Sequence, residues 1–253
     1  MSDAPQPPAD HYSYAVYADP AMAESFDALR FSGPIGRLVA ESQEHVIASF
    51  LSPVAGRTIL DVGTGTGRAA LALAARGATV TGVDASAEML AVAERHAKEA
   101  GLSVTFTRGD AHGLAFPSQS FDAVICLRVL MHTPDWRTSL GELCRIARTR
   151  VVFDYPALAS AAALQALTRH VAHALGARVE AYRVFSDRAV RTVLAANAFR
   201  VVETHRQFVL PIALHKMVNS AAATGRIESG LARTGLTRLL GSPVTLVAER
   251  CAS

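Results

Sequence analysis

The sequence predicts an α/β fold: a mostly parallel sheet of seven strands with helices on both of its faces. Short apolar runs of strand length alternate with helical patterns through the middle of the chain, which is typical of parallel βαβ units. A glycine-rich turn joins the first strand to the first central helix. Half of the 253 residues are hydrophobic, which is enough for a large core.

The first strand is predicted at residues 59–62, and the turn after it carries Gly63, Gly65 and Gly67 at alternate positions. Glycine adopts positive φ at little cost, and it lets a ligand approach the bare backbone. A helix is expected to follow over residues 69–75. This order of strand, tight turn and helix predicts a ligand-binding turn, although an ordinary βα turn would also use glycine.

Two residues of this turn bear on the kind of ligand. A dinucleotide-binding turn has the pattern G-x-G-x-x-G, and here Arg68 stands where its last glycine would be. Asp61 adds a negative charge just before the turn. Both features disfavour a pyrophosphate, and Asp61 favours a ligand that carries an ammonium or sulfonium group.

The second strand is predicted at residues 78–84 and ends in Asp84. This residue lies about 20 positions after Gly63, where a nucleotide-binding fold places the carboxylate that accepts ribose hydroxyls. The alternative is a turn acid or helix cap. Ser86 competes for the cap role because it directly precedes the helix expected over residues 87–100.

Two further strands, at residues 104–107 and 121–127, lead into Asp110 and into the segment from Arg128 to His132. Taken in order, these four motifs resemble those of class I methyltransferases that use S-adenosylmethionine. The resemblance covers roughly residues 55–155. It is closest to the methyltransferase type 11 group, which includes quinone-type and other small-molecule enzymes.

The resemblance implies a Rossmann-like fold with the last strand antiparallel, and S-adenosyl-L-methionine as the cofactor. In that family an acid at the position of Asp84 holds the ribose, and one at Asp110 meets the adenine amino group. The residues expected to bind the cofactor are Asp61, Gly63, Thr64, Gly65, Gly67, Asp84, Ala85, Met89, Asp110, Ala111, Leu127 and Arg128.

Residues 1–54 are expected to form an N-terminal helical segment, and residues 55–253 the cofactor-binding domain, with helical insertions at about 157–185 and 211–242. In related enzymes such a segment closes over the cofactor; alternatively, its tyrosines pack the helices onto the core. Tyr17 and Arg30 are its candidate substrate-binding residues. Arg30 could pair with a carboxylate through two hydrogen bonds.

His132 follows the fourth strand and is the candidate general base, because its ordinary pKa lies near neutrality. The alternative is that it only positions the acceptor. Asp154 and Tyr155 end the fifth strand and could line the acceptor pocket. His112 is expected to border the adenine or to be exposed, and His215 to be solvated or part of a pocket wall.

No metal is expected, because the three cysteines are far apart and Asp154 does not lead into the Asp-Asn pair of cation-dependent catechol-type O-methyltransferases. The net charge of +3 is dispersed, so nucleic acid is not implied. No apolar run is long enough to span a bilayer, and the start of the chain lacks the features of a secretory signal. A cytoplasmic enzyme, monomeric or homodimeric, is therefore expected.

The predicted function is in-line methyl transfer to an oxygen, carbon or nitrogen of a small, hydrophobic or aromatic molecule. The helical additions, which are apolar, favour such an acceptor. Two alternatives remain open: a protein that binds S-adenosylmethionine without turnover, and a nicotinamide-dependent oxidoreductase. Arg68 and Asp61 disfavour the second alternative.

Overall fold

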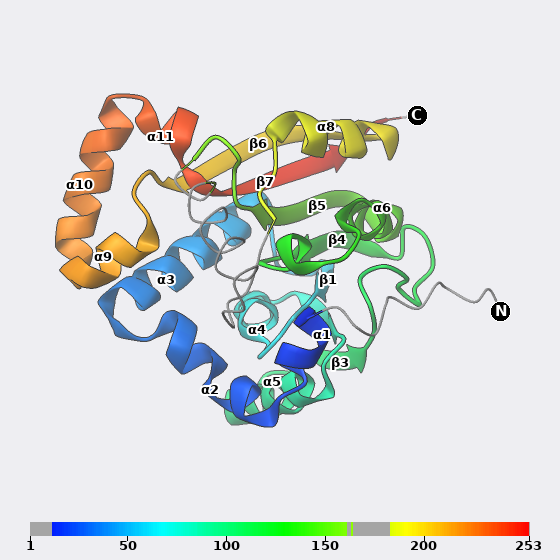
Figure 1. Cartoon of the computed structure of the whole chain (residues 1–253). Helices are drawn as coiled ribbons and strands as arrows, with labels where there is room; N and C mark the ends of the chain where they lie inside the picture. The colour runs from blue at the N-terminus through cyan, green and yellow to red at the C-terminus, as the bar shows by residue number, and fades with distance from the viewer. Residues whose placement is uncertain (1–11, 161–162, 164–182, 253) are drawn as a thin grey trace.

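The computed structural model describes residues 12–160, 163 and 183–252, and these form one seven-stranded sheet with helices packed on both faces (Figure 1). The strand order is β3-β2-β1-β4-β5-β7-β6, and β7 is antiparallel to both of its neighbours while the other pairs are parallel. The predicted fold class and its antiparallel last strand are confirmed. The strands are β1 (Thr58–Val62), β2 (Thr79–Asp84), β3 (Thr105–Arg108), β4 (Phe121–Cys126), β5 (Ala147–Tyr155), β6 (Phe199–Phe208) and β7 (Ser242–Arg250).

The helices fall into three groups: an N-terminal group, the helices that cover the sheet, and a group between β6 and β7 (Figure 1). The first group is α1 (Tyr12–Tyr17), α2 (Pro20–Phe31) and α3 (Gly33–Phe50). The second is α4 (Arg68–Ala74), α5 (Ala87–Glu99), the short 3-10 helix η1 (Leu130–His132), α6 (Trp136–Ile146) and α8 (Asp187–Ala196). The third is α9 (Ile212–Val218), α10 (Ala221–Arg233) and α11 (Leu236–Leu240).

Alternate residues of the central strands build two separate cores, as expected when successive side chains point to opposite faces. Leu60 and Val124 belong to the core that is covered by α6 and α8. Ile59 and Ile125 belong to the core that is covered by α3 and α4. All four residues are fully buried, so strands β1 and β4 form the rigid centre of the molecule.

The chain reverses its direction across the sheet at the boundary between β1 and β4. From β1 it proceeds outward through β2 to β3, and it then returns to β4 on the other side of β1. Helices that follow β1 and β4 therefore lie on opposite faces, which leaves a crevice at the carboxyl ends of these two strands. This topology places the ligand site beyond Val62 and Cys126.

Some expectations need correction. Helix α1 was not predicted, because its six tyrosine-rich residues are too few to show a helical period. On α3, the helical spacing of Leu38, Val39, Val46, Ile47 and Phe50 predicts one buried stripe. Ile47 and Phe50 are buried, but Leu38, Val39 and Val46 are only half-buried. The reason is that α3 contacts α2, α4 and α10 as well as the core, so its apolar side chains are divided among several neighbours.

The predicted insertion at 211–242 corresponds to helices α9 to α11. The insertion predicted at about 157–185 lies mostly outside the described residues. Among the helices that the structure describes, none is both long and apolar enough to cross a bilayer.

Candidate functional site

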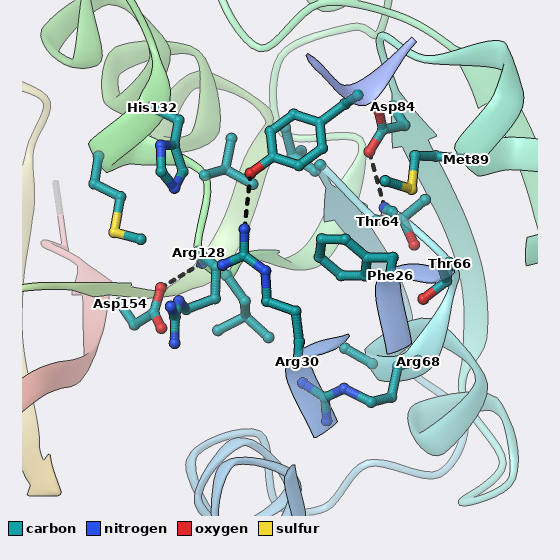
Figure 2. A pocket seen from close by; sticks show the side chains of 18 of the residues that line it. Phe26, Arg30, Thr64, Thr66, Arg68, Asp84, Met89, Arg128, His132 and Asp154 are labelled. Carbon is teal, nitrogen blue, oxygen red and sulfur yellow. Dashed lines mark hydrogen bonds between the residues drawn. The ribbon is translucent and has the colours of Figure 1, made fainter. Parts of the chain in front are cut away.

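A pocket of about 620 Å³ lies at the carboxyl ends of β1, β2, β4 and β5 (Figure 2). This volume is in the range typical of small-molecule sites. The turns that follow these strands form its floor. Helix α2 and the segment that joins β6 to α9 contribute its walls.

The turn after β1 presents its backbone to the pocket. Gly63 has a φ of +71°, and a Cβ there would lie 2.2 Å from Cγ2 of Val129, so only glycine fits. Gly65 has a φ of +56°, and a Cβ there would meet no atom within 4 Å. Its missing side chain therefore leaves room for a ligand against the backbone. Gly67, also predicted as a cofactor residue, does not line the pocket; it precedes α4 and lies against Ala93.

Asp84 ends β2 and lines the pocket beside this turn (Figure 2). One carboxylate oxygen, Oδ2, accepts the backbone N–H of Gly65 at 2.8 Å, and Oδ1 accepts that of Ser86 at 2.9 Å. Ser86 caps α5 by accepting the N–H of Met89, so the helix does not use Asp84 as its cap. Each oxygen of Asp84 keeps a further lone pair, which suits it to accept two hydroxyl groups. Burial raises its pKa, and backbone hydrogen bonds from Ser86, Gly65 and Ala85 oppose this effect.

Asp61 lies beneath the turn and is 2% exposed. Burial raises its pKa to about 6; the hydrogen bond from Thr64 and the charge of Arg68 oppose this effect, and the neighbouring charge of Asp84 adds to it. The hydroxyl of Thr64 donates to Oδ2 at 2.8 Å. The backbone N–H of Ala70 also acts on its pKa. A buried carboxylate with so few donors among the described residues would be stabilised by a cationic ligand.

Asp110 and His112 form a hydrogen-bonded chain at the edge of the pocket. The hydroxyl of Tyr14 donates to Oδ2 of Asp110 at 2.5 Å, and Nδ1 of His112 lies 2.6 Å from Oδ1. Nε2 of His112 accepts the N–H of Asp135, so its hydrogen is on Nδ1. His112 is 8% exposed, which excludes the second of its two predicted alternatives, an exposed side chain. Although burial opposes it, these hydrogen bonds lower the pKa of Asp110.

Helices α1 and α2 cover the pocket and are bonded to its floor. The hydroxyl of Ser86 donates to the backbone oxygen of Tyr17 at 2.7 Å, and that of Thr66 donates to Asp27 at 2.9 Å. Arg30 donates to the hydroxyl of Tyr17 at 3.3 Å (Figure 2). The N-terminal segment is therefore part of the site, and it brings the predicted residues Tyr17 and Arg30 to the pocket wall.

His132 reaches the same wall from η1 and is 6% exposed. Its ring meets that of Tyr17 edge to face, with 6.3 Å between the centroids. Tyr155 also lines the pocket, but its hydroxyl donates to Asp187 at 3.1 Å. Tyr155 therefore contributes its ring to the pocket, while its hydroxyl is held by α8.

Arg128 and Asp154 stand side by side at the ends of β4 and β5 (Figure 2). The backbone N–H of Arg128 donates to Oδ1 of Asp154 at 2.5 Å, and Gln43 donates to Oδ2 at 3.4 Å. Burial raises the pKa of Asp154, and the charge of Arg128 opposes the increase. Arg128 has a φ of +62°, which is uncommon for a residue with a side chain.

Two features of the site were not predicted from the sequence. The end of β6 and the segment after it, including α9, supply Phe208, Leu210 and Lys216 to the pocket wall, and no sequence motif marks these residues. Arg68 stacks on the ring of Phe31 at 4.4 Å and bonds to side chains of α3, including Glu44. It thus joins α4 to the N-terminal segment.

The helices between β6 and β7 are held by a buried network. Nε2 of His215 lies 2.8 Å from Glu228, and the hydroxyl of Thr224 lies 3.2 Å from Nδ1. Glu228 also accepts the backbone N–H groups of Val209 and Leu210, at 2.9 Å and 3.1 Å. These two residues line the pocket, so the network fixes one pocket wall. His215 is 1% exposed and does not line the pocket, which corrects the earlier expectation for this residue.

Comparison with known proteins agrees with this geometry. Residues 59–150, which include the turn after β1 and the ends of β2 and β4, match the family model described as a methyltransferase domain. The matched segment supplies most of the floor of the pocket.

Curated relatives match the same part of the chain. A ubiquinone biosynthesis O-methyltransferase of Pseudomonas syringae is 49% identical over 84 residues, which are 32% of this chain and 36% of that protein. A demethylmenaquinone methyltransferase of Thermus thermophilus is 42% identical over 107 residues, which are 40% of this chain and 49% of that protein. The chain thus spans less than half the length of these relatives.

Solved structures extend the similarity of fold to nearly the whole chain. Magnesium protoporphyrin IX methyltransferase of Synechocystis with bound SAH covers 94% of this chain and 98% of its own, with a TM-score of 0.67 and 19% identity. The [4+2]-cyclase SpnF covers all of both chains, with a TM-score of 0.68 and 19% identity. At this identity the similarity concerns the fold alone.

Proposed function

We propose that the protein transfers a methyl group from S-adenosyl-L-methionine to an oxygen, carbon or nitrogen of a small apolar or aromatic molecule. The observation that carries this proposal is the pairing of Asp84 with the open backbone of Gly65 in one pocket, above the buried Asp61. The similarity of residues 59–150 to methyltransferase domains supports it. So do the names of the quinone-biosynthesis relatives.

The residues present fit this cofactor. Asp84 has free lone pairs for two ribose hydroxyls, and the space over Gly65 accepts a bulky group. Asp61 supplies a buried negative charge that favours the cationic end of the cofactor. Asp110, which Tyr14 and His112 hold in place, borders the same pocket and is suited to accept the adenine amino group.

The cofactor, when bound, supplies an activated methyl group on a sulfonium. The contribution of the chain is alignment and exclusion of water. Helices α1 and α2 cover the pocket, and the rings of Tyr17 and His132 line it where an acceptor can approach the ends of β1 and β4. We assign His132 to shaping this part of the pocket, because a base is needed only when the acceptor must lose a proton.

Non-catalytic binding and nicotinamide chemistry are the competing functions. Arg68, which is bonded to α3 and stacked on Phe31, occupies the place of the glycine that a dinucleotide turn requires, and this disfavours nicotinamide binding. Catalysis is tested by incubating the protein with methyl-labelled S-adenosylmethionine and a small-molecule cell extract. Label should enter an extract component with the wild type and not with Asp84→Ala. Binding of the cofactor without any labelled product would contradict the proposal.

A further inference from the structure

Charged side chains of both signs line the pocket. Asp61 and Asp84 lie at the ends of β1 and β2, and three cations come from other segments: Arg128 after β4, Arg30 on α2 and Lys216 on α9. Arg128 stands beside the buried Asp154. We propose, resting on the methyl-transfer function above, that the apolar or aromatic acceptor also carries a carboxylate or phosphate group, which Arg128 receives. Two observations support this role: the Nε atom of Arg128 has no hydrogen-bond partner among the described residues, and the backbone of Arg128 has a positive φ.

The guanidinium of Arg128 lacks a full set of acceptors. Its Nε atom is buried and has no hydrogen-bond partner among the described residues. The neighbouring Asp154 accepts the backbone N–H of Arg128 and the side chain of Gln43. A buried donor without an acceptor costs free energy, and a charged ligand oxygen is the acceptor that suits a guanidinium best.

The backbone points to the same role. Arg128 has a φ of +62°, a conformation that is unfavourable for a residue with a side chain. Its bond to Asp154 at the end of β5 holds it in this conformation. Figure 2 shows its side chain among the pocket residues, beside Asp154. Such strain persists where the surroundings impose it, and here it keeps a long cationic side chain at the pocket wall.

S-adenosylmethionine also carries one carboxylate, so the group that binds Arg128 must be assigned either to the cofactor or to the acceptor. Arg30 belongs to α2, and α2 also supplies Asp27 to the hydroxyl of Thr66 in the turn after β1. That position suits Arg30 to the amino-acid end of the cofactor. Arg128 stands at β4 beside β5, on the side of β1 away from Asp84 and its proposed ribose. Two other cations line the pocket, but Arg68 is bonded to α3 and Arg108 donates to the backbone oxygen of Ala85. Arg128 and Lys216 are therefore the cations assigned to the acceptor half of the pocket.

The experiment separates a small-molecule extract by anion exchange at neutral pH into a retained, anionic pool and an unretained pool. Each pool is incubated with methyl-labelled S-adenosylmethionine and wild-type protein, Arg128→Asn, Arg128→Lys or Arg188→Asn. Asparagine tolerates positive φ, so Arg128→Asn removes the guanidinium without adding strain. Arg188 is exposed on α8 and lies outside the pocket, so its variant controls for the lost charge. Affinity for S-adenosylhomocysteine is measured for every variant.

We expect label to enter the retained pool only. Arg128→Asn should lose roughly 10- to 100-fold in kcat/KM on that pool, while its affinity for S-adenosylhomocysteine changes by less than about threefold. Arg128→Lys should recover part of the loss, and Arg188→Asn should match the wild type. Label from the unretained pool alone, or full activity in Arg128→Asn, would overturn the inference. A loss of S-adenosylhomocysteine affinity equal to the loss of activity would assign Arg128 to the cofactor instead. No label from either pool would contradict methyl transfer itself.

Discussion

Asp61 should couple both stability and cofactor binding to pH. Burial raises its pKa from 3.8 to about 6 in the folded protein. The folded chain therefore binds this proton more tightly than the unfolded chain does. Below about pH 4 the residue is protonated in both states, and its favourable contribution is fully present. As the pH rises through about 6 that contribution is lost, and the cost of a buried carboxylate amounts to about 3 kcal/mol.

The substitution Asp61→Asn removes this cost while it keeps an oxygen that can accept the hydroxyl of Thr64. Without ligand, the variant should be more stable than the wild type at about pH 8, by up to about 3 kcal/mol, and the two should converge near about pH 4. Urea unfolding at several pH values measures the difference. Asp84 also has a raised pKa, so the comparison of the two proteins isolates the contribution of Asp61.

Cofactor binding should depend on pH in the opposite direction and strengthen as the pH rises. A cationic cofactor stabilises the carboxylate, so binding below about pH 6 must release the proton of Asp61. The Kd for S-adenosylmethionine should therefore fall by up to about tenfold per pH unit as the pH rises toward 6, and then level off. Asp61→Asn should bind more weakly at pH 8 and lack this slope. An equal slope in both proteins, measured by calorimetry, would refute the electrostatic role of Asp61.

Four further outcomes are expected. Asp84→Ala should fold and bind S-adenosylmethionine more weakly by about 2–5 kcal/mol, and unchanged affinity in calorimetry would remove its assignment to the ribose. Gly65→Val should abolish binding because the side chain enters the open space over the turn, whereas Thr66→Val should lose only the contact with α2; equal effects would mean that the turn does not face the ligand. His132→Asn should keep most of its turnover, and its pH profile should be unchanged. A rate lower by about a hundredfold, together with loss of an ionisation at about pH 6.5, would instead make His132 the base. Glu228→Gln should lower the free energy of unfolding by about 2–4 kcal/mol, because an amide cannot accept from two backbone N–H groups and a histidine at once; an unchanged urea midpoint would contradict this.

The sequence is informative about the site where one short segment carries the chemistry. The turn from Gly63 to Gly65 and the acid at Asp84 are recognisable because their roles depend on backbone conformation and on fixed positions at strand ends. The strand ends differ from prediction by only a few residues for the same reason. In the central strands and their turns, the residues that are recognisable in the sequence are also those that the sheet places at its carboxyl edge.

Contacts between distant segments could not be predicted in this way. Where α1 packs determines the hydrogen bond of Tyr14 to Asp110 and the contact of Tyr17 with His132. With six residues, α1 is too short to show a helical pattern in the sequence. The position of Lys216 depends on the fold of the segment after β6. The left-handed backbone of Arg128 has no signal in sequence, because that residue is neither glycine nor asparagine.

The most direct test of the central claim, that this pocket binds S-adenosylmethionine through the turn after β1, is a calorimetric titration of the wild-type protein with that cofactor and, separately, with NAD. We expect one molecule of S-adenosylmethionine to bind per chain and NAD to give no binding, because Arg68 and Asp61 disfavour a pyrophosphate at the turn. Binding of NAD, with no binding of S-adenosylmethionine, would contradict the account.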